Sequence, residues 1–353
     1  MHIAIRLGVA WLVSAGLGVG GSAAANLSTA VEHASKSGFE GVVLVTDRDK
    51  VLYERAVGTA NRETKTPHAA TQVWRWASVT KMIAAIIASQ LVEENKLALD
   101  KPVADYLTRD EFGGEHAARI RIRDLLQHTS GLAKPEVEDA ALPPAGASIN
   151  AHAARTICAA PAKRAPGERM EYNNCDYLVL GAILEKVTGR AFDALVEERI
   201  AKPLALTSIG KPEAVRGYLD LKRAEDAGRI PAFGAGGAMT GTPRDLATLD
   251  RALLNGKLIS PAMREIFWKG EPSLGFIAFG VWAYPAPLKG CKEPVALIER
   301  RGAIGGIQVR NVLIPARDRA LIVFTNRADV NFGEVWQGSG LTHDLLAAML
   351  CPL

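Results

Sequence analysis

One short motif in this sequence pairs a nucleophile with a potential base. Ser78 and Lys81 are separated by two residues, in the segment Ser78-Val79-Thr80-Lys81. A serine hydroxyl is a weak nucleophile until a neighbouring group accepts its proton. If Ser78 begins a buried helix, Lys81 lies one turn later on the same face, where burial and the positive helix end would lower the pKa of its amine. The pair could then attack a carbonyl carbon, with the Ser78 N–H as one donor to the resulting oxyanion.

A second copy of the same spacing shows that the motif needs support from its context. Ser-x-x-Lys recurs at Ser208–Lys211, among Gly and Pro residues that indicate a loop. Around the first copy, Ser78–Leu97 is rich in Ala, Ile and Leu and contains no Gly or Pro, which predicts a long buried helix. The competing interpretation is a helix N-cap at Ser78 followed by a solvated Lys81.

Other common hydrolase motifs are absent from the 353 residues. The chain has no Gly-x-Ser-x-Gly, which argues against an α/β-hydrolase nucleophile, and no His-Glu-x-x-His, which argues against a zinc hydrolase. The formal net charge is +4 and no long run of Lys and Arg occurs, so a nucleic-acid partner is not expected. The hydrophobic fraction of 48% is ordinary for a globular protein and excludes wholesale disorder.

The elements that must position this pair include strands near both ends of the chain. Residues 41–58 form two β-branched runs around a polar turn, which predicts a hairpin. A final helix is predicted at 341–350, after strands at 276–284, 295–300, 306–314 and 320–326. Short turns between these strands imply an antiparallel sheet. The first hairpin must join the late strands, because two strands alone are marginally stable.

The middle of the chain is predicted to be mainly helical. Helices are expected around Asp124, over 177–196 with a break at Thr188-Gly189, and after an N-cap at Thr242. The predicted fold class is therefore α+β, an antiparallel sheet flanked by helices with an inserted, mainly helical lobe. The α/β lobe would comprise about 26–80 and 236–353, and the helical lobe about 81–235.

Residues 1–25 have the layout of a secretory signal peptide. A short basic head precedes an apolar run of small residues at 7–21, and Ala23–Ala25 offers a cleavage site. The alternatives are a buried N-terminal helix or a membrane anchor, although the run is short for a span. No Arg-Arg pair and no Cys at the cleavage site occur, which favours Sec export without a lipid. We expect a periplasmic or secreted protein with no stable membrane span after signal removal.

Export would place the four cysteines in an oxidising compartment. Cys158, Cys175, Cys291 and Cys351 allow three pairings. The predicted pairs are the sequential ones, Cys158–Cys175 and Cys291–Cys351, because each joins neighbours in the predicted chain order. The sequence contains no Cys-x-x-Cys, so neither a zinc site nor a thioredoxin-like redox motif is expected.

Further motifs follow the Ser78–Lys81 pair in order. They are LLQHTSGL at Leu125–Leu132, PGERMEYNN at Pro166–Asn174 and GGAM at Gly236–Met239. From about Gly41 to about Asn326, this order and spacing resembles the serine β-lactamase and penicillin-binding-protein superfamily. The likeness is greatest to its class C-like branch, which includes esterases and D-amino-acid peptidases. The resemblance implies a β-lactamase/DD-peptidase-like fold, with residues 26–353 as one serine hydrolase domain.

The resemblance also implies roles for individual residues. Ser78 matches the acylated nucleophile and Lys81 its base partner. Tyr172 and Asn174 match the Tyr-x-Asn motif, in which the Tyr relays protons and the Asn orients the substrate amide and the Lys. Two nearby cations would lower the pKa of the Tyr172 phenol and make it a usable base or acid. His128 matches a structural position that braces the site.

The third family motif, usually Lys-Thr-Gly or His-Thr-Gly, is altered in this chain. Arg300-Arg301-Gly302-Ala303 occupies its place, with Arg300 at the cation position and Arg301 at the Thr position. The resemblance makes Ala303 N–H the second oxyanion donor, and Gly302 keeps the spacing. Arg300 could hold a substrate carboxylate bidentately, but loss of the Thr hydroxyl argues against efficient β-lactam turnover. Arg301 could instead lie on a solvated strand edge, since alternate strand positions face opposite ways.

These observations predict an exported serine hydrolase that forms a Ser78 acyl-enzyme with an ester or amide. An esterase or D-amino-acid peptidase is favoured, with at most weak β-lactamase activity. The expected partner is a small-molecule or peptide substrate, and no metal or organic cofactor is needed. The alternative is a non-catalytic penicillin-binding-like protein that binds cell-wall peptide or a partner protein. The presence of Ser78, Lys81, Tyr172 and Asn174 together argues against that alternative.

Overall fold

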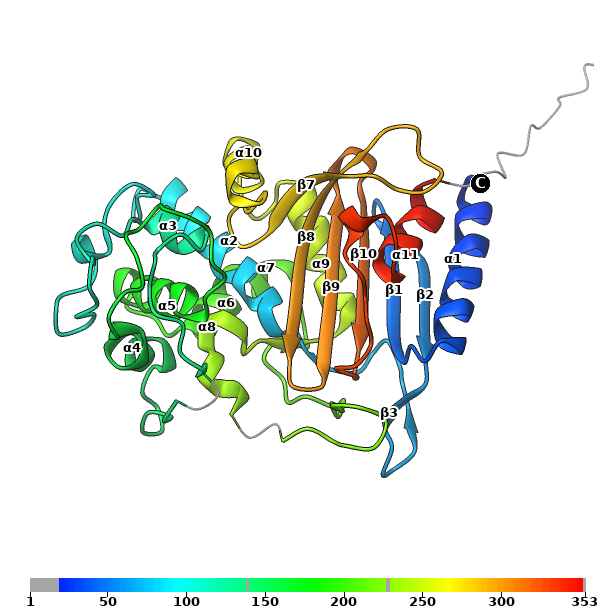
Figure 1. Ribbon diagram of the computed structural model, residues 1–353, viewed down its shortest axis with the longest axis horizontal. Coiled ribbons are helices and arrows are strands. Elements are labelled where there is room, and N and C mark those ends of the chain that lie inside the picture. Colours follow the sequence, from blue (N-terminus) through cyan, green and yellow to red (C-terminus); the bar gives the residue numbers. More distant parts are fainter. Residues whose placement is uncertain (1–18, 138–139, 227–228, 352–353) are drawn as a thin grey trace, which may run out of the picture.

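The computed structural model describes residues 19–137, 140–226 and 229–351, and its centre is a six-stranded antiparallel sheet (Figure 1). The strand order is β2-β1-β10-β9-β8-β7. Its strands are β1 Gly41–Asp47, β2 Lys50–Val57, β7 Trp282–Ala286, β8 Val295–Ile304, β9 Ile307–Ile314 and β10 Arg319–Thr325. β1 pairs with β10 so that Gly41 lies opposite Thr325. The N-terminal hairpin therefore joins the late strands, as the sequence predicts.

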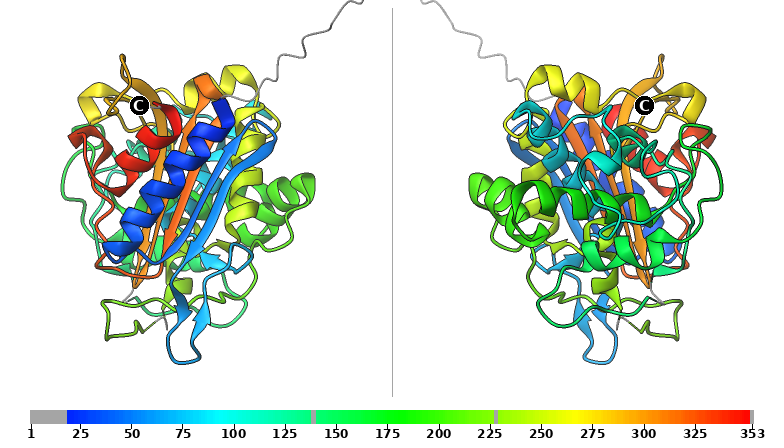
Figure 2. Two further views of the ribbon diagram at one scale, coloured as in Figure 1. Left: turned by 90° about the vertical axis from the view of Figure 1, so that its right-hand side faces the viewer. Right: turned by 90° about the vertical axis from the view of Figure 1, so that its left-hand side faces the viewer.

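Helices cover both faces of this sheet. They are α1 (Val19–Lys36) and α11 (Leu341–Leu350) on one face and α9 (Pro243–Leu254) on the other. The left view of Figure 2 shows α1 and α11 side by side in front of the strands. Along β1, Val43 and Val45 pack with the α1–α11 layer, whereas Val42 and Leu44 pack on the opposite side. This alternation follows from the period of two in a β-strand.

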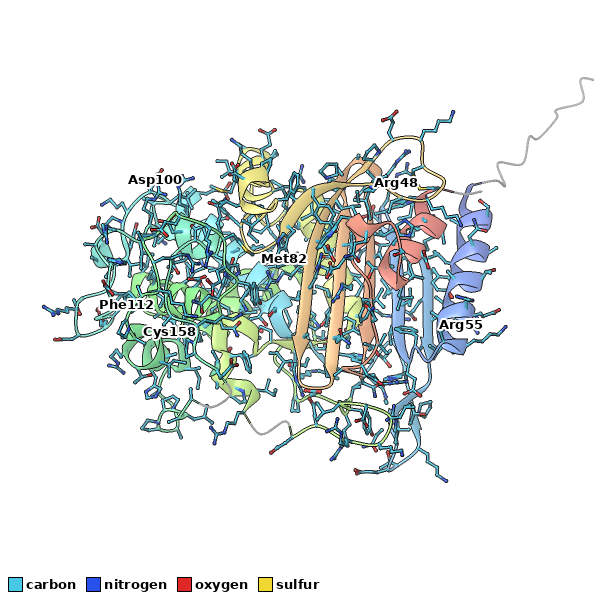
Figure 3. All side chains as sticks on the ribbon, viewed as in Figure 1. Arg48, Arg55, Met82, Asp100, Phe112 and Cys158 are labelled. Atoms are coloured by element: carbon cyan, nitrogen blue, oxygen red, sulfur yellow. A yellow bond between two sulfur atoms is a disulfide. The ribbon has the colours of Figure 1, made fainter. Side chains whose placement is uncertain are left out.

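The helical part lies beside the sheet (Figure 1). Its elements are the 3₁₀ turn η1 (Ala77–Val79), α2 (Thr80–Glu93), α3 (Ile122–Leu126), α4 (Ile149–Arg155), α5 (Asn174–Thr188), α6 (Phe192–Val196), α7 (Lys202–Leu204), α8 (Gly234–Gly237) and α10 (Pro261–Phe267). α2 contacts α5 and α8 and is buried along most of its length. Figure 3 shows its Met82 side chain, which is fully buried, between the sheet and the helical segments.

Two predicted elements differ in extent from those observed. The helix predicted over 78–97 is η1 followed by α2, and it ends at Glu93 because Asn95 adopts a left-handed conformation with a φ of 56°. The strand predicted over 276–284 begins only at Trp282. Phe276 and Gly280 have φ values of 63° and 72°, which no extended strand accommodates.

The helix breaks and caps agree with the sequence. α5 ends at Gly189, whose φ of 67° gives the left-handed C-cap that a glycine adopts without strain. The Thr242 side chain accepts a hydrogen bond from Asp245 N–H at 3.1 Å and caps α9. Short strands β5 (Trp74–Arg75) and β6 (Thr240–Gly241) pair with each other, which ties the segment before η1 to the segment before α9.

The predicted signal peptide falls mostly outside the described residues. Residues 1–18 are not among them, while 19–25 form the first turns of α1, where Ala23 is buried. Cleavage after Ala25 would leave a helix that is still anchored by the buried side chain of Leu27. Within the described ranges, no helix combines the length and apolar character needed to cross a membrane.

Both disulfides join cysteines that are neighbours in chain order. Cys158 is bonded to Cys175 and so links the turn after α4 to the first residues of α5. Cys291 is bonded to Cys351 and links the β7–β8 connection to the end of α11. These are the sequential pairs, and the first lies next to the Tyr172–Asn174 segment.

Candidate active site

Ser78 is held in the tight turn η1 against strand β8. The preceding residue, Ala77, has a φ of 47°, and the Ser78 side chain is 8% exposed. Gly302 on β8 makes this approach possible, because a Cβ there would lie 2.7 Å from Trp76 O and 3.2 Å from Ser78 N. Any larger residue at 302 would therefore push β8 away from the turn that carries Ser78.

The Ser78 hydroxyl lies between a phenol and an amine. Its Oγ is 2.6 Å from Tyr172 OH, and Lys81 Nζ donates to the same Oγ at 3.3 Å. Lys81 Nζ also donates to Asn174 Oδ1 at 2.7 Å and to Gly236 O at 2.5 Å. The structure thus brings together Ser78, Lys81, Tyr172 and Asn174, which come from two separate sequence segments.

The electrostatics of this cluster lower the pKa values of both bases. Burial lowers the pKa of Lys81 to about 8, and the Arg300 charge acts in the same direction against an opposing contribution from Tyr172. Burial by itself would raise the pKa of Tyr172, but the Lys81 and Arg300 charges bring it down to about 8. Both pKa values therefore move towards neutral pH, where a general base or acid works most effectively.

Arg300 is fully buried and makes its hydrogen bonds to the site itself. Its Nε donates to Ser78 O at 2.7 Å, and its Nη2 donates to Tyr172 OH at 2.8 Å. The guanidinium carbon lies 5.4 Å from the Tyr172 ring centre and 5.3 Å from that of Trp282. Its Nη1 has no hydrogen-bond partner among the described residues. The cation therefore acts on Ser78 and Tyr172 from inside the protein.

Arg301 lies apart from the Ser78 cluster. Its Nε and Nη2 each donate to the Glu299 carboxylate at 2.9 Å, and its Nη1 contacts Glu334. Successive residues of β8 face opposite sides of the sheet, so Arg301 shares a face with Glu299 rather than with Arg300. Ala303, the predicted second oxyanion donor, is exposed and follows Gly302 on the same strand.

His128 lies directly beneath Tyr172. The two ring centres are 4.6 Å apart, and His128 Nδ1 is 2.8 Å from Asp176 Oδ2. Burial, together with the charges of Arg300 and Lys81, holds the pKa of His128 well below its usual value. Burial also raises the pKa of Asp176 well above its usual value. Both shifts disfavour the charged form of the group concerned, and the His128 ring packs against the Tyr172 ring.

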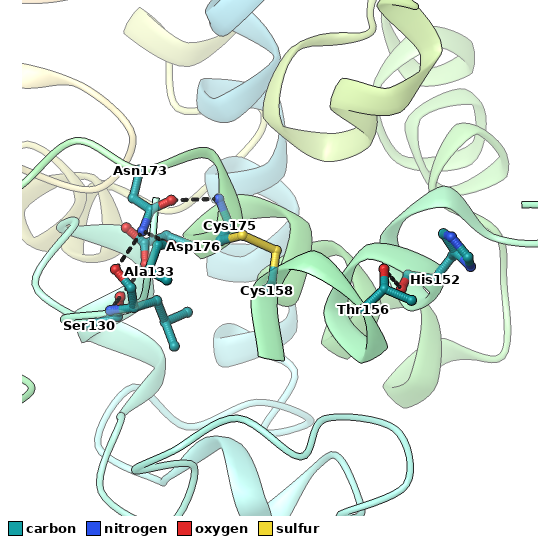
Figure 4. Close-up of a disulfide and its surroundings, with 9 residues drawn as sticks. Ser130, Ala133, His152, Thr156, Cys158, Asn173, Cys175 and Asp176 are labelled. Atoms are coloured by element: carbon teal, nitrogen blue, oxygen red, sulfur yellow. Dashed lines mark hydrogen bonds between the residues drawn. A yellow bond between two sulfur atoms is a disulfide. The ribbon is translucent and has the colours of Figure 1, made fainter. Parts of the chain in front are cut away.

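The segment that carries Tyr172 and Asn174 is fixed at several points (Figure 4). The Asn173 side chain accepts the Cys175 N–H at 2.9 Å and donates to Ala133 O at 2.9 Å. The Cys158–Cys175 disulfide anchors the next residue along the chain. The positions of Tyr172 and Asn174 therefore depend on contacts of the neighbouring residues, and not only on contacts of their own side chains.

Sequence reasoning missed two groups at the site. Trp282, whose ring centre is 6.3 Å from that of Tyr172, comes from a strand that carries no family motif. Asp176 lies two residues after Asn174. Its position near the start of a buried helix is the sequence signal that could have identified it. Among the described residues, no group of three or more His, Cys, Asp or Glu side chains could hold a metal ion.

Comparisons with known proteins agree on the family. Residues 27–337 match the sequence model of the Beta-lactamase family. The chain is 33% identical over 181 residues to Esterase EstB of Burkholderia gladioli, a match that covers 48% of this chain and 46% of the esterase. It is 35% identical over 190 residues to a putative D-alanyl-D-alanine carboxypeptidase of Escherichia coli O157:H7, which covers 48% of this chain and 43% of the relative. Each of these matches thus spans less than half of the curated relative.

A solved structure supports the same fold. The D-amino acid amidase of Ochrobactrum anthropi SV3, complexed with L-phenylalanine amide, superposes with a TM-score of 0.74 at 20% identity. The superposition covers 94% of this chain and 98% of the amidase. The predicted β-lactamase/DD-peptidase-like fold is thereby confirmed. The family match extends over most of the sequence, and this chain therefore belongs to the Beta-lactamase family.

Proposed function

We propose that this protein is an exported serine hydrolase that acts on an ester or amide through a Ser78 acyl-enzyme. One observation carries the proposal: Ser78 Oγ is 2.6 Å from Tyr172 OH and 3.3 Å from Lys81 Nζ, within hydrogen-bonding reach of both. A nucleophile next to a base that is itself oriented by other groups is the usual arrangement for covalent catalysis. Gly236 O and Asn174 Oδ1 supply that orientation for Lys81.

The proposed reaction proceeds in two steps. Tyr172, held as the phenolate by the neighbouring Lys81 and Arg300 charges, accepts the Ser78 proton while Oγ bonds to the carbonyl carbon and the carbonyl oxygen becomes an oxyanion. Ser78 N–H and Ala303 N–H stabilise that oxyanion. The proton on Tyr172 then passes to the departing alcohol or amine as its bond to carbon breaks. Water attacks the acyl-enzyme with Tyr172 again as base, which releases the acid and restores Ser78.

The surroundings of Arg300 and Arg301 support the proposed substrate class. Arg300 is buried and uses Nε and Nη2 on Ser78 and Tyr172, while Arg301 is paired with Glu299 on the other face of β8. Arg300 keeps only Nη1 without a partner among the described residues, which argues against the bidentate grip on a substrate carboxylate that the sequence alone suggested. This favours an esterase or D-amino-acid peptidase over an efficient β-lactamase. The names of the two curated relatives, an esterase and a putative carboxypeptidase, point in the same direction.

Export is part of the proposal. The N-terminal sequence has a signal-peptide layout, and both disulfides use all four cysteines of the chain. Structural disulfides persist in oxidising compartments such as the periplasm and the extracellular space. A periplasmic or secreted protein is therefore consistent with its cysteine chemistry.

Activity-based labelling tests the proposed function. The purified protein and its Ser78→Ala variant are incubated separately with a fluorescent fluorophosphonate and with a fluorescent penicillin. We expect fluorophosphonate labelling of the wild type, weak or no penicillin labelling, and no labelling of the variant. Labelling of neither kind in a folded wild-type protein would reject the enzyme and favour a non-catalytic binding protein. Strong, rapidly hydrolysed penicillin labelling would reject the substrate ranking.

A further inference from the structure

A buried arginine just upstream of Ser78 forms the centre of an ionic network. Arg75 lies three residues before Ser78, at the end of β5, and its side chain is fully buried. Its Nε and Nη2 donate to Glu213 Oε2 at 3.1 and 3.0 Å. Its Nη2 and Nη1 donate to Glu225 at 2.8 and 3.0 Å, and Nη1 also donates to Ile304 O at 2.9 Å. All three nitrogens of this guanidinium therefore donate hydrogen bonds to groups of the protein.

Glu225 extends this network to the turn between β8 and β9. Its Oε2 accepts the Gly306 N–H at 2.6 Å, and its side chain is 4% exposed. Gly305, between the two contact points, has a φ of 56°, and a Cβ there would lie 1.9 Å from Glu225 Oε2. Arg75 and Glu225 thus hold the residue before the Gly305 turn through Ile304 O and the residue after it through Gly306 N.

These contacts join the two segments that carry the proposed oxyanion donors. Ser78 follows Arg75 by three residues, and Ala303 directly precedes Ile304. Gly302, the residue before Ala303, lies against η1, and there is no room for a side chain at this position. The spacing of Ser78 N and Ala303 N therefore depends on how β8 is fixed relative to β5, and Arg75 makes that connection at the turn of the β8–β9 hairpin.

We propose that Arg75 and Glu225 are positioning residues that set the separation of the two oxyanion donors. The inference rests on the proposed function, because an oxyanion forms only if Ser78 is acylated. Burying an arginine with two carboxylates is a weak source of net stability, since desolvation offsets most of the attraction. Such a network does fix direction and distance, and displacement of a catalytic donor by a fraction of an ångström weakens transition-state binding strongly.

Glu213 provides a matched control for Glu225. Both carboxylates bind the same guanidinium, but only Glu225 also accepts the Gly306 N–H. A Glu213→Leu variant disturbs the ionic network without releasing the turn. A Glu225→Leu variant disturbs both, because leucine offers no acceptor to the Gly306 N–H. If the network only stabilises the fold, the two variants should behave alike.

The test compares kcat, KM and the inhibition constant of an aryl boronic acid, whose tetrahedral adduct places an oxygen in the oxyanion position. For Glu225→Leu we expect kcat to fall about 10- to 100-fold, with KM changed less than about threefold. The boronic acid should bind more weakly by a similar factor. Glu213→Leu should lose less than about threefold in kcat. Equal losses in both variants, or a change in KM alone, would overturn the positioning role.

A second variant guards against a folding defect in the buried network. Gly305→Ala changes an exposed turn residue and displaces Glu225 through its new Cβ. We expect the same loss of kcat and of boronic-acid affinity, whereas unchanged kinetics would contradict the inference. Wild-type labelling by a fluorophosphonate separates this result from failure of the proposed function. A labelled wild type with kinetically normal variants rejects only the positioning role, and a folded but unlabelled wild type rejects both.

Discussion

The two faces of strand β8 carry adjacent arginines in opposite electrostatic situations. On the outer face, Arg301 is held by Glu299 through two hydrogen bonds of 2.9 Å and also contacts Glu334. On the inner face, Arg300 is more deeply buried and forms no ion pair with any described residue. Its partners are a carbonyl oxygen and a phenol. The two residues are neighbours in sequence, yet only one of them has its charge neutralised.

This difference separates a charge that is neutralised by its partner from one that acts on several ionisable groups. A paired buried charge acts mainly on its partner, so Arg301 and Glu299 hold β8 against the segment that contains Glu334. An uncompensated charge acts on every titratable group around it. Burial lowers the pKa of Lys81, and the Arg300 charge adds to that shift. The Arg300 charge also lowers the pKa of Tyr172. An unpaired cation in the protein interior indicates a functional site better than the number of arginines in a sequence motif does.

The largest effect is expected from removing the unpaired cation. Arg300→Met should lower kcat/KM by about 10³-fold, because Tyr172 loses a hydrogen-bond donor and a charge that favours its phenolate. The pKa of Tyr172 should rise from about 8 towards its ordinary value. Because the base must be deprotonated, the rising limb of the pH–rate profile should move to higher pH. Steady-state kinetics between pH 6 and 10 would measure both changes.

Arg300→Lys is the matched control for this variant. It keeps the positive charge but can make fewer directed hydrogen bonds. We expect its pH–rate profile to stay near that of the wild type, with a smaller loss of activity. If the Met variant were to retain the wild-type profile, the proposed electrostatic role of Arg300 would be wrong.

Removing the paired cation should affect stability instead. Arg301→Met leaves Glu299, which is 1% exposed, without its bidentate partner, and the free energy of unfolding should fall by about 3 kcal/mol. Activity of the folded protein should change little. A double variant, Arg301→Met with Glu299→Gln, should recover part of the loss. Chemical denaturation followed by tryptophan fluorescence would measure this, and an active-site defect without destabilisation would reverse the assignment of the two arginines.

A third buried ionisable group extends the comparison, because a buried carboxylate can lose its charge by binding a proton. Asp250 on α9 is fully buried, and its partner is the Asn311 amide at 2.9 Å, so burial raises its pKa to about 7. The folded state then binds a proton that the unfolded state releases above about pH 4. Stability from this group is present at low pH and should decline by about 2 kcal/mol between pH 5 and 7.

The Asp250→Asn variant tests this pH dependence. An amide at this position does not titrate, so the variant should lose less stability than the wild type over the same pH interval. Melting temperatures at pH 5, 6 and 7 would show the difference. Parallel curves for the two proteins would mean that Asp250 is ionised throughout and that its burial is compensated in another way.

Much of the architecture and the central cluster could be predicted from the sequence. The Tyr172–Asn174 segment and the Ser78–Lys81 helix carry local motifs, and the structure places their side chains within hydrogen-bonding distance of one another. The hairpin at 41–58 and the helix cap at Thr242 depend on neighbouring residues, which is why simple patterns located them. These features are encoded over short stretches of chain.

The rest depends on contacts between distant segments. The direction of Arg301 follows from which β8 residue faces η1, and a shift of one residue would have reversed it. Arg75 binds Glu213 and Glu225, which lie 138 and 150 residues away, with no local pattern to mark them. Trp282 approaches Tyr172 only because β7 is the edge strand next to β8. Register and long-range pairing decided these positions.

The place of β10 in the sheet has a consequence for how the chain folds. β10 lies between β1 and β9, and the contact from Thr325 Oγ1 to Glu40 O spans 285 residues. Contacts so distant in sequence form late and slowly, and they require nearly the whole chain to be synthesised. The last strand to emerge thus completes the centre of the sheet rather than its edge. A chain that stopped after β9 would lack the strand that joins its two halves, so premature termination here should yield an unfolded product rather than a shortened folded protein.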